Sequence, residues 1–379
     1  MDFGDSPDEA SFRARLRGWL EHNNPGLPPS PTADAYWAGQ AAWHRALYDA
    51  GFFGVSWPVQ IGGQGLPAVY DVIVDEELAV ARAPLRPSVA YLVHGMLRHG
   101  SEQVQQRFLP GLVSGRERWC QGFSEPDAGS DLASLRTRAE PAPGNGEEYL
   151  ITGRKIWTSY SDAADWCLVL ARTDPAVPKH KGISAFVVPM RQPGIEQRPL
   201  RMINGVTREF GEVVFDGARA RGADMVGAPG EGWRLAMTVV NHEREPGELG
   251  YVTRYTKVVN DLVARVRAQP GQLLPEQASD LGWAIVECEM LRLHVCRRLS
   301  DRLDGVSHGP EGSVDKLLMT SAEQAVGHAA LAVGGAAHGG GSGADLGVYL
   351  YSRAQSVMGG TSQIQRNLVA TRILGLPTG

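Results

Sequence analysis

Met358-Gly359-Gly360-Thr361-Ser362-Gln363-Ile364-Gln365-Arg366, near the end of a 379-residue chain, joins two glycines to a run of hydroxyl and amide side chains. Adjacent glycines adopt backbone conformations closed to residues with a Cβ, and they let the backbone approach a ligand closely. Ser362, followed three residues later by Gln365, fits a capping box and predicts a helix start. Free N–H groups at such a start suit a phosphate or an oxyanion. Gly375 and Pro377 predict where the helix ends. Taken alone, the stretch indicates only a capped helix near the end of the chain.

The composition describes a globular chain. It is 43% hydrophobic and 21% charged, and its length allows two or three domains. A formal net charge of −5 argues against binding to nucleic acid or to an anionic membrane surface. The start is acidic, unlike a signal peptide, and no apolar run reaches the length of a membrane span. Four scattered cysteines form no Cys-x-x-Cys pair, which argues against a disulfide framework or a zinc site, so we expect a cytoplasmic protein.

The hydrophobic spacing changes twice along the chain. It is helical in the first third, breaks into short apolar runs between turn residues from about residue 119, and becomes helical again after Gly230-Glu231-Gly232. We therefore predict an α+β protein with an N-terminal helical domain (1–117), a central antiparallel β-barrel or sandwich domain (118–226) and a C-terminal helical bundle (227–379). The expected helices include 69–81, 101–109 (ending at Pro110), 233–241, 258–266, 281–303 and 314–333. The expected strands are 149–151, 155–157, 166–171, 183–188 and 213–215, with turns at Thr152-Gly153, Asp174-Pro175 and Pro193-Gly194.

Two stretches of the central block carry possible chemistry. Residues 119–131 read Trp-Cys-Gln-Gly-Phe-Ser-Glu-Pro-Asp-Ala-Gly-Ser-Asp, an apolar strand that runs into a turn rich in hydroxyls and small residues. An ordinary Pro-Asp turn often has the same composition. Residues 155–159 read Lys-Ile-Trp-Thr-Ser and place Trp157 beside two hydroxyls at a strand end. An indole there can stack on a planar ring while Thr158 or Ser159 bonds the ring's polar edge, and core packing is the alternative for a lone tryptophan.

Three motifs in order carry a resemblance to a known family: Phe-Ser-Glu-Pro-Asp-Ala-Gly-Ser-Asp, then Lys-Ile-Trp-Thr-Ser, then Gly-Thr-Ser-Gln-Ile-Gln-Arg. Together they resemble the FAD-dependent acyl-CoA dehydrogenases over nearly the whole chain, including the helical, β and helical blocks. The resemblance implies FAD lying between the β domain and the C-terminal bundle. It also implies an oligomer, usually a tetramer, in which neighbouring subunits help to bind the cofactor.

Carried over residue by residue, the resemblance implies a role for each motif. Residues that would line the flavin are Gln121, Phe123 and Ser124, with Ser124 bonding its pyrimidine side, Trp157 packing on its ring and Ser159 bonding near its reactive edge. Ser130 would face the acyl-CoA. Thr361 and Gln363 would contact the phosphate and ribose region of the cofactor.

One departure from the family pattern concerns the catalytic base. Many members have a glutamate immediately before Gly-Thr-Ser-Gln that takes the α-proton of the substrate, and here that position is Gly359. A subset places the base in a Glu-Arg pair on the first long helix of the C-terminal bundle, which Glu243 and Arg244 match, so we expect Glu243 to be the base and Arg244 to lie at the substrate. If the helix continues, Glu243 shares a face with Val239 and Val240, and an apolar setting raises a carboxyl pKa as a general base requires. A solvated Glu-Arg pair on a charged helix face is the alternative.

Gly359 keeps one expected role and raises two further questions. In this family a backbone N–H at that position, with a flavin ribityl hydroxyl, holds the thioester oxygen, and that contact needs no side chain. The missing side chain also favours a branched or cyclic acyl group. The family segments that reach a neighbour's FAD have poor matches at 265–270 and 333–338, which leaves the adenine-end contacts and the mode of assembly open.

The resemblance therefore implies α,β-dehydrogenation of an acyl thioester, on coenzyme A or on a carrier protein, to the trans-2-enoyl thioester. An electron-transfer flavoprotein is the expected electron acceptor, and the assembly is expected to be a homo- or hetero-oligomer, a tetramer or a dimer. Two alternatives remain. One is a flavin-dependent monooxygenase on the same fold, which needs no carboxylate base. The other is a non-catalytic subunit paired with an active homologue in a mixed tetramer.

Overall fold

The computed structural model describes residues 4–26, 34–144, 147–243, 249–268, 273–304, 306, 309–336 and 343–377. The α-helices in this part of the chain are α1 (Pro7–Asn23), α2 (Asp34–Asp49), α3 (Val69–Val80), α4 (Ala90–His99), α5 (Glu102–Val113), α6 (Gly232–Glu243), α7 (Leu249–Ala268), α8 (Pro275–Leu303), α9 (Gly312–Ala336), α10 (Gly343–Ala354) and α11 (Ser362–Leu368). The strands are β1 (Trp119–Gly122), β2 (Arg138–Pro141), β3 (Glu148–Ser159), β4 (Trp166–Arg172), β5 (Ile183–Pro189), β6 (Ile195–Arg201) and β7 (Thr207–Arg221).

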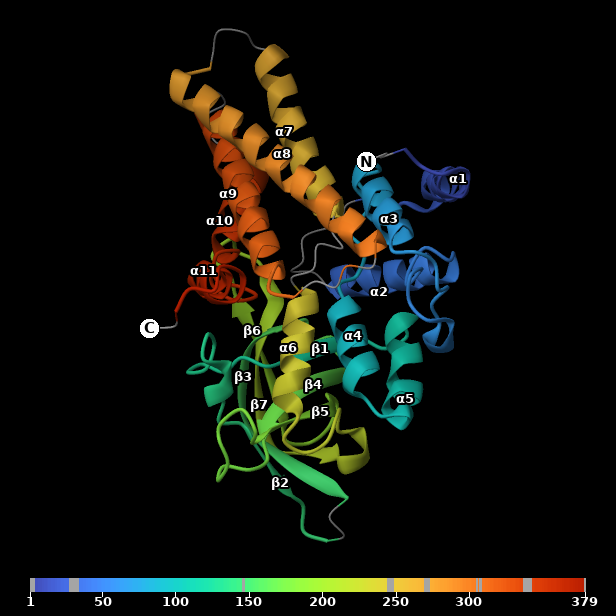
Figure 1. Ribbon diagram of the computed structural model, residues 1–379, viewed down its shortest axis with the longest axis vertical. Helices are drawn as coiled ribbons and strands as arrows, with labels where there is room; N and C mark the ends of the chain where they lie inside the picture. Colours follow the sequence, from blue (N-terminus) through green and yellow to red (C-terminus); the bar gives the residue numbers. More distant parts are fainter. Residues whose placement is uncertain are drawn as a thin grey trace.

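The predicted order of helices, sheet and helices is confirmed. The long helices α7, α8 and α9 project away from the sheet, whereas α6 lies against the sheet beside α4 (Figure 1). The chain starts beside α3 and ends beyond α11, on the opposite flank of the molecule (Figure 1). Among the described residues, no helix is long and apolar enough to cross a membrane.

The first helices follow the predicted spacing with one correction. Helix α3 covers almost the predicted span, and α4 was not predicted. The prediction that the helix at 101–109 stops at Pro110 is wrong, because α5 continues through Pro110 to Val113. Leu112 and Val113, in the added turn, are fully buried in the core. Burying two such side chains contributes about 1.5–3 kcal/mol each, which together is enough to offset the roughly 3 kcal/mol that an interior proline costs.

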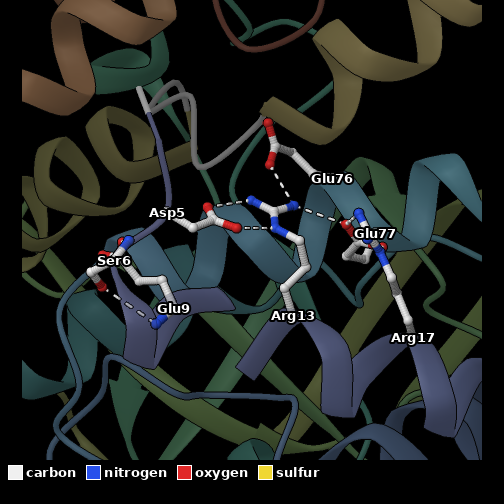
Figure 2. Close-up of polar contacts among 7 residues, drawn as sticks. All are labelled: Asp5, Ser6, Glu9, Arg13, Arg17, Glu76 and Glu77. Carbon is white, nitrogen blue, oxygen red and sulfur yellow. Dashed lines mark hydrogen bonds and ion pairs between the residues drawn. The ribbon is translucent and has the colours of Figure 1, made fainter. Parts of the chain in front are cut away.

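An ion-pair cluster attaches α1 to α3 (Figure 2). The Arg13 guanidinium lies 2.6 Å from Asp5, 3.0 Å from Glu76 and 2.8 Å from Glu77. Arg17, one turn further along α1, donates to Glu77 at 2.6 Å. Because the Glu77 side chain is only 3% exposed, it depends on these two arginines to replace its lost hydration.

The seven strands form one sheet in the order β1-β4-β2-β3-β7-β6, with β5 paired to β4. The pairs β2–β3, β3–β7, β4–β5 and β6–β7 are antiparallel, as predicted. Strand β4 also pairs in parallel with β1 and, through one residue pair, with β2, which the local pattern did not predict. Leu168 and Leu170 of β4 join the core shared with the helices, while Val169 faces the core inside the curled sheet. Burial on both faces explains why β4 and β5 are almost continuously apolar.

The central block also corrects one predicted turn. Thr152-Gly153 is not a turn but lies inside β3, at a shift in register against β7. Gly153 packs so closely against the residue before β2 that a Cβ at Gly153 would lie 2.4 Å from the Thr137 hydroxyl oxygen. A glycine that allows close approach of two backbones has therefore the same sequence signature as a turn glycine. The predicted turns at Asp174-Pro175 and Pro193-Gly194 are confirmed, and β2 and β6 were not predicted.

The C-terminal helices form two packing groups. Leu235, Ala236 and Val239 of α6 are fully buried in the same core as α3, α4 and α5. Helices α7, α8 and α9 share a separate apolar core that includes Val259, Leu291 and Val326 among its members. The last residue of α6 is therefore carried on a helix that is fixed to the N-terminal helices and to β5, not to the projecting bundle.

Candidate functional site

A buried lysine brings the first two motifs together. The Lys155 side chain is fully buried, and its ammonium donates to the Phe123 carbonyl and to a Glu125 carboxylate oxygen, each at 2.9 Å. The Ile156 amide donates to the Ser124 carbonyl at 3.0 Å. The segment that follows β1 therefore lies directly against the end of β3, although about thirty residues separate them in the chain.

The acid of this pair is held by the backbone as well. Glu125 is 8% exposed and accepts from the amides of Arg136 at 2.7 Å and Thr137 at 2.8 Å. Burial alone would raise the pKa of Glu125, but the Lys155 ammonium and the hydrogen bonds from residues 136 and 137 hold that pKa below its ordinary value. Burial lowers the pKa of Lys155, against the attraction of Glu125. The carboxylate form of Glu125 is thus the favoured one at neutral pH.

The tryptophan of the second motif lies in an unusual conformation. The β3–β7 register shifts between Lys155 and Thr158, so a bulge forms at Ile156-Trp157. Trp157 has a φ of 59° and Tyr160 has a φ of 60°, and residues other than glycine rarely adopt these left-handed values. The indole is 60% exposed and touches Phe210 edge-on, with ring centroids 6.3 Å apart. The alternative of simple core packing for Trp157 is therefore wrong.

The other cofactor candidates of the central block differ in accessibility. Ser124, Ser159 and Gln121 are half-buried. The Thr158 side chain is fully buried. The Phe123 ring is 4% exposed and belongs to the core. Its predicted place at the flavin stays a prediction. Ser130 is exposed in the loop before Asp131, which pairs with Lys179 at 2.8 Å.

Glu209 connects the second motif to the C-terminal one. Its carboxylate accepts from the Tyr351 hydroxyl of α10 at 2.9 Å, and its carbonyl accepts from the Tyr160 amide at 2.9 Å. Burial raises the pKa of Glu209, although the bond from Tyr351 works against that shift. Because α10 leads into the turn at Gly359-Gly360, the Glu209–Tyr351 contact joins this turn to the strand that pairs with Ser159.

The C-terminal turn confirms the glycine prediction and corrects the cap. Gly359 has a φ of 61° and Gly360 a φ of 91°. The predicted capping box of Ser362 with Gln365 is wrong, because the N-cap is Thr361, whose hydroxyl accepts from the Ile364 amide at 3.2 Å. Gln365 is fully buried and turns back, donating to the carbonyls of Gly359 at 3.0 Å and Gly360 at 3.3 Å. Gln363 is exposed, and Gly375, with a φ of 66°, follows the helical segment as predicted.

The proposed base lies at the edge of what the structure describes. Glu243 is the last residue of α6, and Arg244 and the expected continuation of the helix lie outside the described residues. The helix before Glu243 is tightly packed on α4, since a Cβ at Gly95 would lie 2.6 Å from Val239. One residue before Glu243, the His242 ring stacks on His94 with centroids 4.2 Å apart. The position of this helix end is thus closely defined by its neighbours.

These features fit the isoalloxazine ring of a flavin. An exposed indole in a strained backbone conformation is costly unless a function requires it, and an aromatic face is what a planar tricyclic ring stacks on. Ser124 and Ser159 are half-buried, and they lie in the two chain segments that Lys155 joins. Among the described residues, no group of histidine, cysteine, aspartate and glutamate side chains is arranged to hold a metal ion.

Comparisons with known proteins agree along the whole chain. Three family models match in order, the acyl-CoA dehydrogenase N-terminal domain at residues 6–116, the middle domain at 120–218 and the C-terminal domain at 230–374. Acyl-CoA dehydrogenase IpdE1 of Mycobacterium tuberculosis is 36% identical over 385 residues, which is 98% of each chain. Acyl-CoA dehydrogenase FadE34 of the same organism is 38% identical over 88% of this chain but only 46% of its own length. A solved structure described as Tcur3481-Tcur3483 steroid ACAD is 28% identical, with a TM-score of 0.85 and 100% of both chains covered.

Four residues of this region were not assigned a role from the sequence. Glu125 and Lys155 lie inside the quoted motifs, and strand alternation provides a signal for Lys155, which shares a face with buried Ile151. A lysine on a buried face requires an acidic partner, and Glu125 is the acid of the neighbouring motif. Glu209 and Tyr351 carry no comparable local signal.

Proposed function

Because the chain belongs to the acyl-CoA dehydrogenase family, whose members are FAD flavoproteins, we propose that it converts an acyl thioester into the trans-2-enoyl thioester. The observation that carries this proposal is the meeting of the two central motifs through Lys155, which places Ser124 and the exposed Trp157 in adjoining segments. FAD, when bound, supplies the acceptor for the hydride that leaves the β-carbon. The chain's own residues have three tasks: to hold the ring, to polarise the thioester carbonyl and to take the α-proton.

The proposed base is Glu243. Gly359 has no side chain that can accept a proton, so the carboxylate must come from elsewhere. Glu243 ends a helix whose preceding turns are buried against α4. A general base needs a raised carboxyl pKa, and an apolar setting of Glu243 is proposed to provide it. Arg244 would then lie at the substrate, next to the base in the chain.

The proposed oxyanion donor is the backbone N–H of Gly359. Gln365 bonds the carbonyls of both glycines and so restrains the two peptide groups that follow this N–H in the turn. A preorganised donor of this kind contributes about 3 kcal/mol to transition-state stabilisation. Thr361 and Gln363 follow directly and are proposed to contact the cofactor. The Thr361 hydroxyl already accepts one hydrogen bond within its own helix.

The proposed substrate is a thioester of a bulky, branched or cyclic acid. A Cβ at Gly359 would lie 3.7 Å from the Lys316 Cε, an ordinary contact, so glycine leaves free only the volume that a larger side chain would occupy at this turn. The solved relative described as a steroid ACAD supports a polycyclic acyl group. A panel of straight-chain, branched and polycyclic acyl-CoA thioesters, scored by the rate of flavin bleaching, tests this. Faster turnover of short straight chains would contradict it.

Anaerobic flavin bleaching tests the reaction itself. The purified protein with FAD should bleach on addition of the right thioester, and Glu243→Gln should abolish bleaching while FAD remains bound. Glu276→Gln, which changes an exposed carboxylate at the start of α8, is the matched control and should bleach normally. Full bleaching by Glu243→Gln would show that another group takes the proton.

The proposed assembly is an oligomer with a second copy or a related subunit. Helix α8 exposes Trp283, Val286, Met290 and Leu293, which are spaced so that they lie on one face. Exposed apolar stripes of this length mark protein interfaces. The name of the solved relative joins two components, which favours a mixed assembly and keeps a non-catalytic role as the second candidate. Native mass spectrometry shows whether the assembly contains a second kind of subunit, and flavin bleaching by this chain alone separates a catalytic from a non-catalytic role. An electron-transfer flavoprotein is the proposed electron acceptor.

A further inference from the structure

We propose that the buried Lys155–Glu125 pair is a positioning device that holds the two flavin-facing segments in register, so that FAD affinity depends on it beyond its effect on folding. The inference rests on the proposed placement of the flavin beside Trp157. It assigns a role to two residues that need not touch the cofactor.

The pair joins three segments of chain at one point. One Glu125 oxygen accepts from Lys155 at 2.9 Å and from the Thr137 amide at 2.8 Å, and the other accepts from the Arg136 amide at 2.7 Å. The Lys155 ammonium adds the Phe123 carbonyl at 2.9 Å. The loop after β1, the entry to β2 and the end of β3 therefore share one buried ionic centre.

The lysine stem fixes the distance between β1 and β3. A Cβ at Gly122 would meet the Lys155 Cγ at 3.5 Å, so the aliphatic chain runs beside the last residue of β1. Its ammonium then bonds the carbonyl of the very next residue. An apolar side chain of the same length could fill this space, but it could not hold the carbonyl of Phe123 or the carboxylate of Glu125 in place.

The pair acts immediately before the strained bulge. Ile156 follows Lys155 and bonds the Ser124 carbonyl, and Trp157 comes next with its left-handed φ of 59°. A residue keeps such a conformation only where the surrounding structure determines it strongly. Lys155 and the Ile156 amide are the nearest fixed points on the N-terminal side of Trp157, so loosening them frees both the indole and Ser124.

A pair that only stabilised the fold would behave differently. Removing one partner of a buried ion pair leaves an uncompensated charge and destabilises strongly, whereas replacing both by neutral groups of similar size commonly restores stability. Lys155→Met alone leaves the Glu125 carboxylate buried without its counter-ion. Lys155→Met combined with Glu125→Gln removes both charges and separates folding from positioning.

The test uses full-length protein stripped of FAD and titrated with FAD, with the visible circular dichroism of the bound flavin and the Tm of the apoprotein measured in parallel. We expect the double variant to melt at a higher Tm than Lys155→Met, to bind FAD at least tenfold more weakly than the wild type and to show an altered flavin dichroism. Arg107→Met, which breaks the 2.6 Å pair with Asp224 between α5 and the segment after β7, should lower the Tm and leave FAD affinity unchanged. Its guanidinium packs over the rings of Phe108 and Trp166, which lie outside the motif segments.

The outcomes are distinct. A double variant that is folded and binds FAD with wild-type affinity and dichroism overturns the positioning role and leaves the proposed function intact. A wild-type protein that takes up no FAD overturns the proposed function, and the inference with it. If the single variant does not fold, the double variant alone decides.

Discussion

The hydrogen bond between Tyr351 and Glu209 provides the sharpest test of how the C-terminal turn is attached to the sheet. Glu209 is mostly buried, and burial raises its pKa above the ordinary value of 4.5. A raised carboxyl pKa means that the folded state resists ionisation. Its contribution to stability is therefore complete below the ordinary pKa and is lost as the pH rises through the raised one.

Removing the Tyr351 hydroxyl should increase the stability that is lost when Glu209 ionises. The bond is 2.9 Å long and reaches an ionisable oxygen. A hydrogen bond to a charged group contributes about 1.5–3 kcal/mol, and one to a neutral group about 1 kcal/mol. We therefore expect Tyr351→Phe to reduce the free energy of unfolding by about 2 kcal/mol at pH 8, and by less at pH 5, where more of Glu209 is protonated in the folded state.

Thermal unfolding followed by circular dichroism at pH 5 and pH 8 measures both the loss and its pH dependence. Tyr349→Phe is the matched control on the same helix, because the Tyr349 ring packs on the Arg353 guanidinium at 4.6 Å and that contact does not need the hydroxyl. In a Glu209→Gln background, Tyr351→Phe should cost the same free energy of unfolding at pH 8 as at pH 5. An equal loss at both pH values, or one no greater than that of Tyr349→Phe, would refute the reasoning.

Three further changes have definite expected outcomes. Trp157→Ala should weaken FAD binding by up to about tenfold, the upper end for an aromatic stacking contact, with little change in the Tm of the apoprotein, because the indole is exposed; equal affinity would remove Trp157 from the site. Glu77→Gln should make the free energy of unfolding fall less steeply at acid pH: burial acts to raise the pKa of Glu77, but the bonds from Arg17 and Arg13 outweigh it and hold that pKa below 4.5. The stabilisation by Glu77 is therefore present above pH 4.5 and is lost as the pH falls below it, and an unchanged acid limb of the stability curve would contradict this. Gly359→Ala should cost about 1–2 kcal/mol because of the left-handed φ of 61° and not because of a clash, whereas Gly347→Ala, inside α10 with nothing within 4 Å, should stabilise the helix by up to about 1 kcal/mol. Melting curves of the two glycine variants that shift in the same direction would show that the turn is not strained for alanine.

The spacing of apolar residues was sufficient to locate helices and strands where burial of one face or of a whole strand dominates. The helical spacing of apolar residues located α3 and the cores of α7, α8 and α9, and the continuous apolar runs located β4 and β5. The pattern failed where tertiary contacts reversed a local preference. Buried Leu112 and Val113 carry α5 through Pro110, and the close approach of Thr137 explains a glycine inside β3.

The sequence by itself determined the family, the order of the three blocks and the motifs that supply the candidate cofactor residues, because those signals lie in short stretches of consecutive residues. Only the tertiary structure decided how the motifs meet. The partners of Lys155 and of Tyr351 lie far away in the chain, and a buried charge or hydroxyl does not reveal its partner through spacing. The strained conformation of Trp157 follows from the bulge between β3 and β7, which arises from the pairing of two strands and is encoded in neither alone.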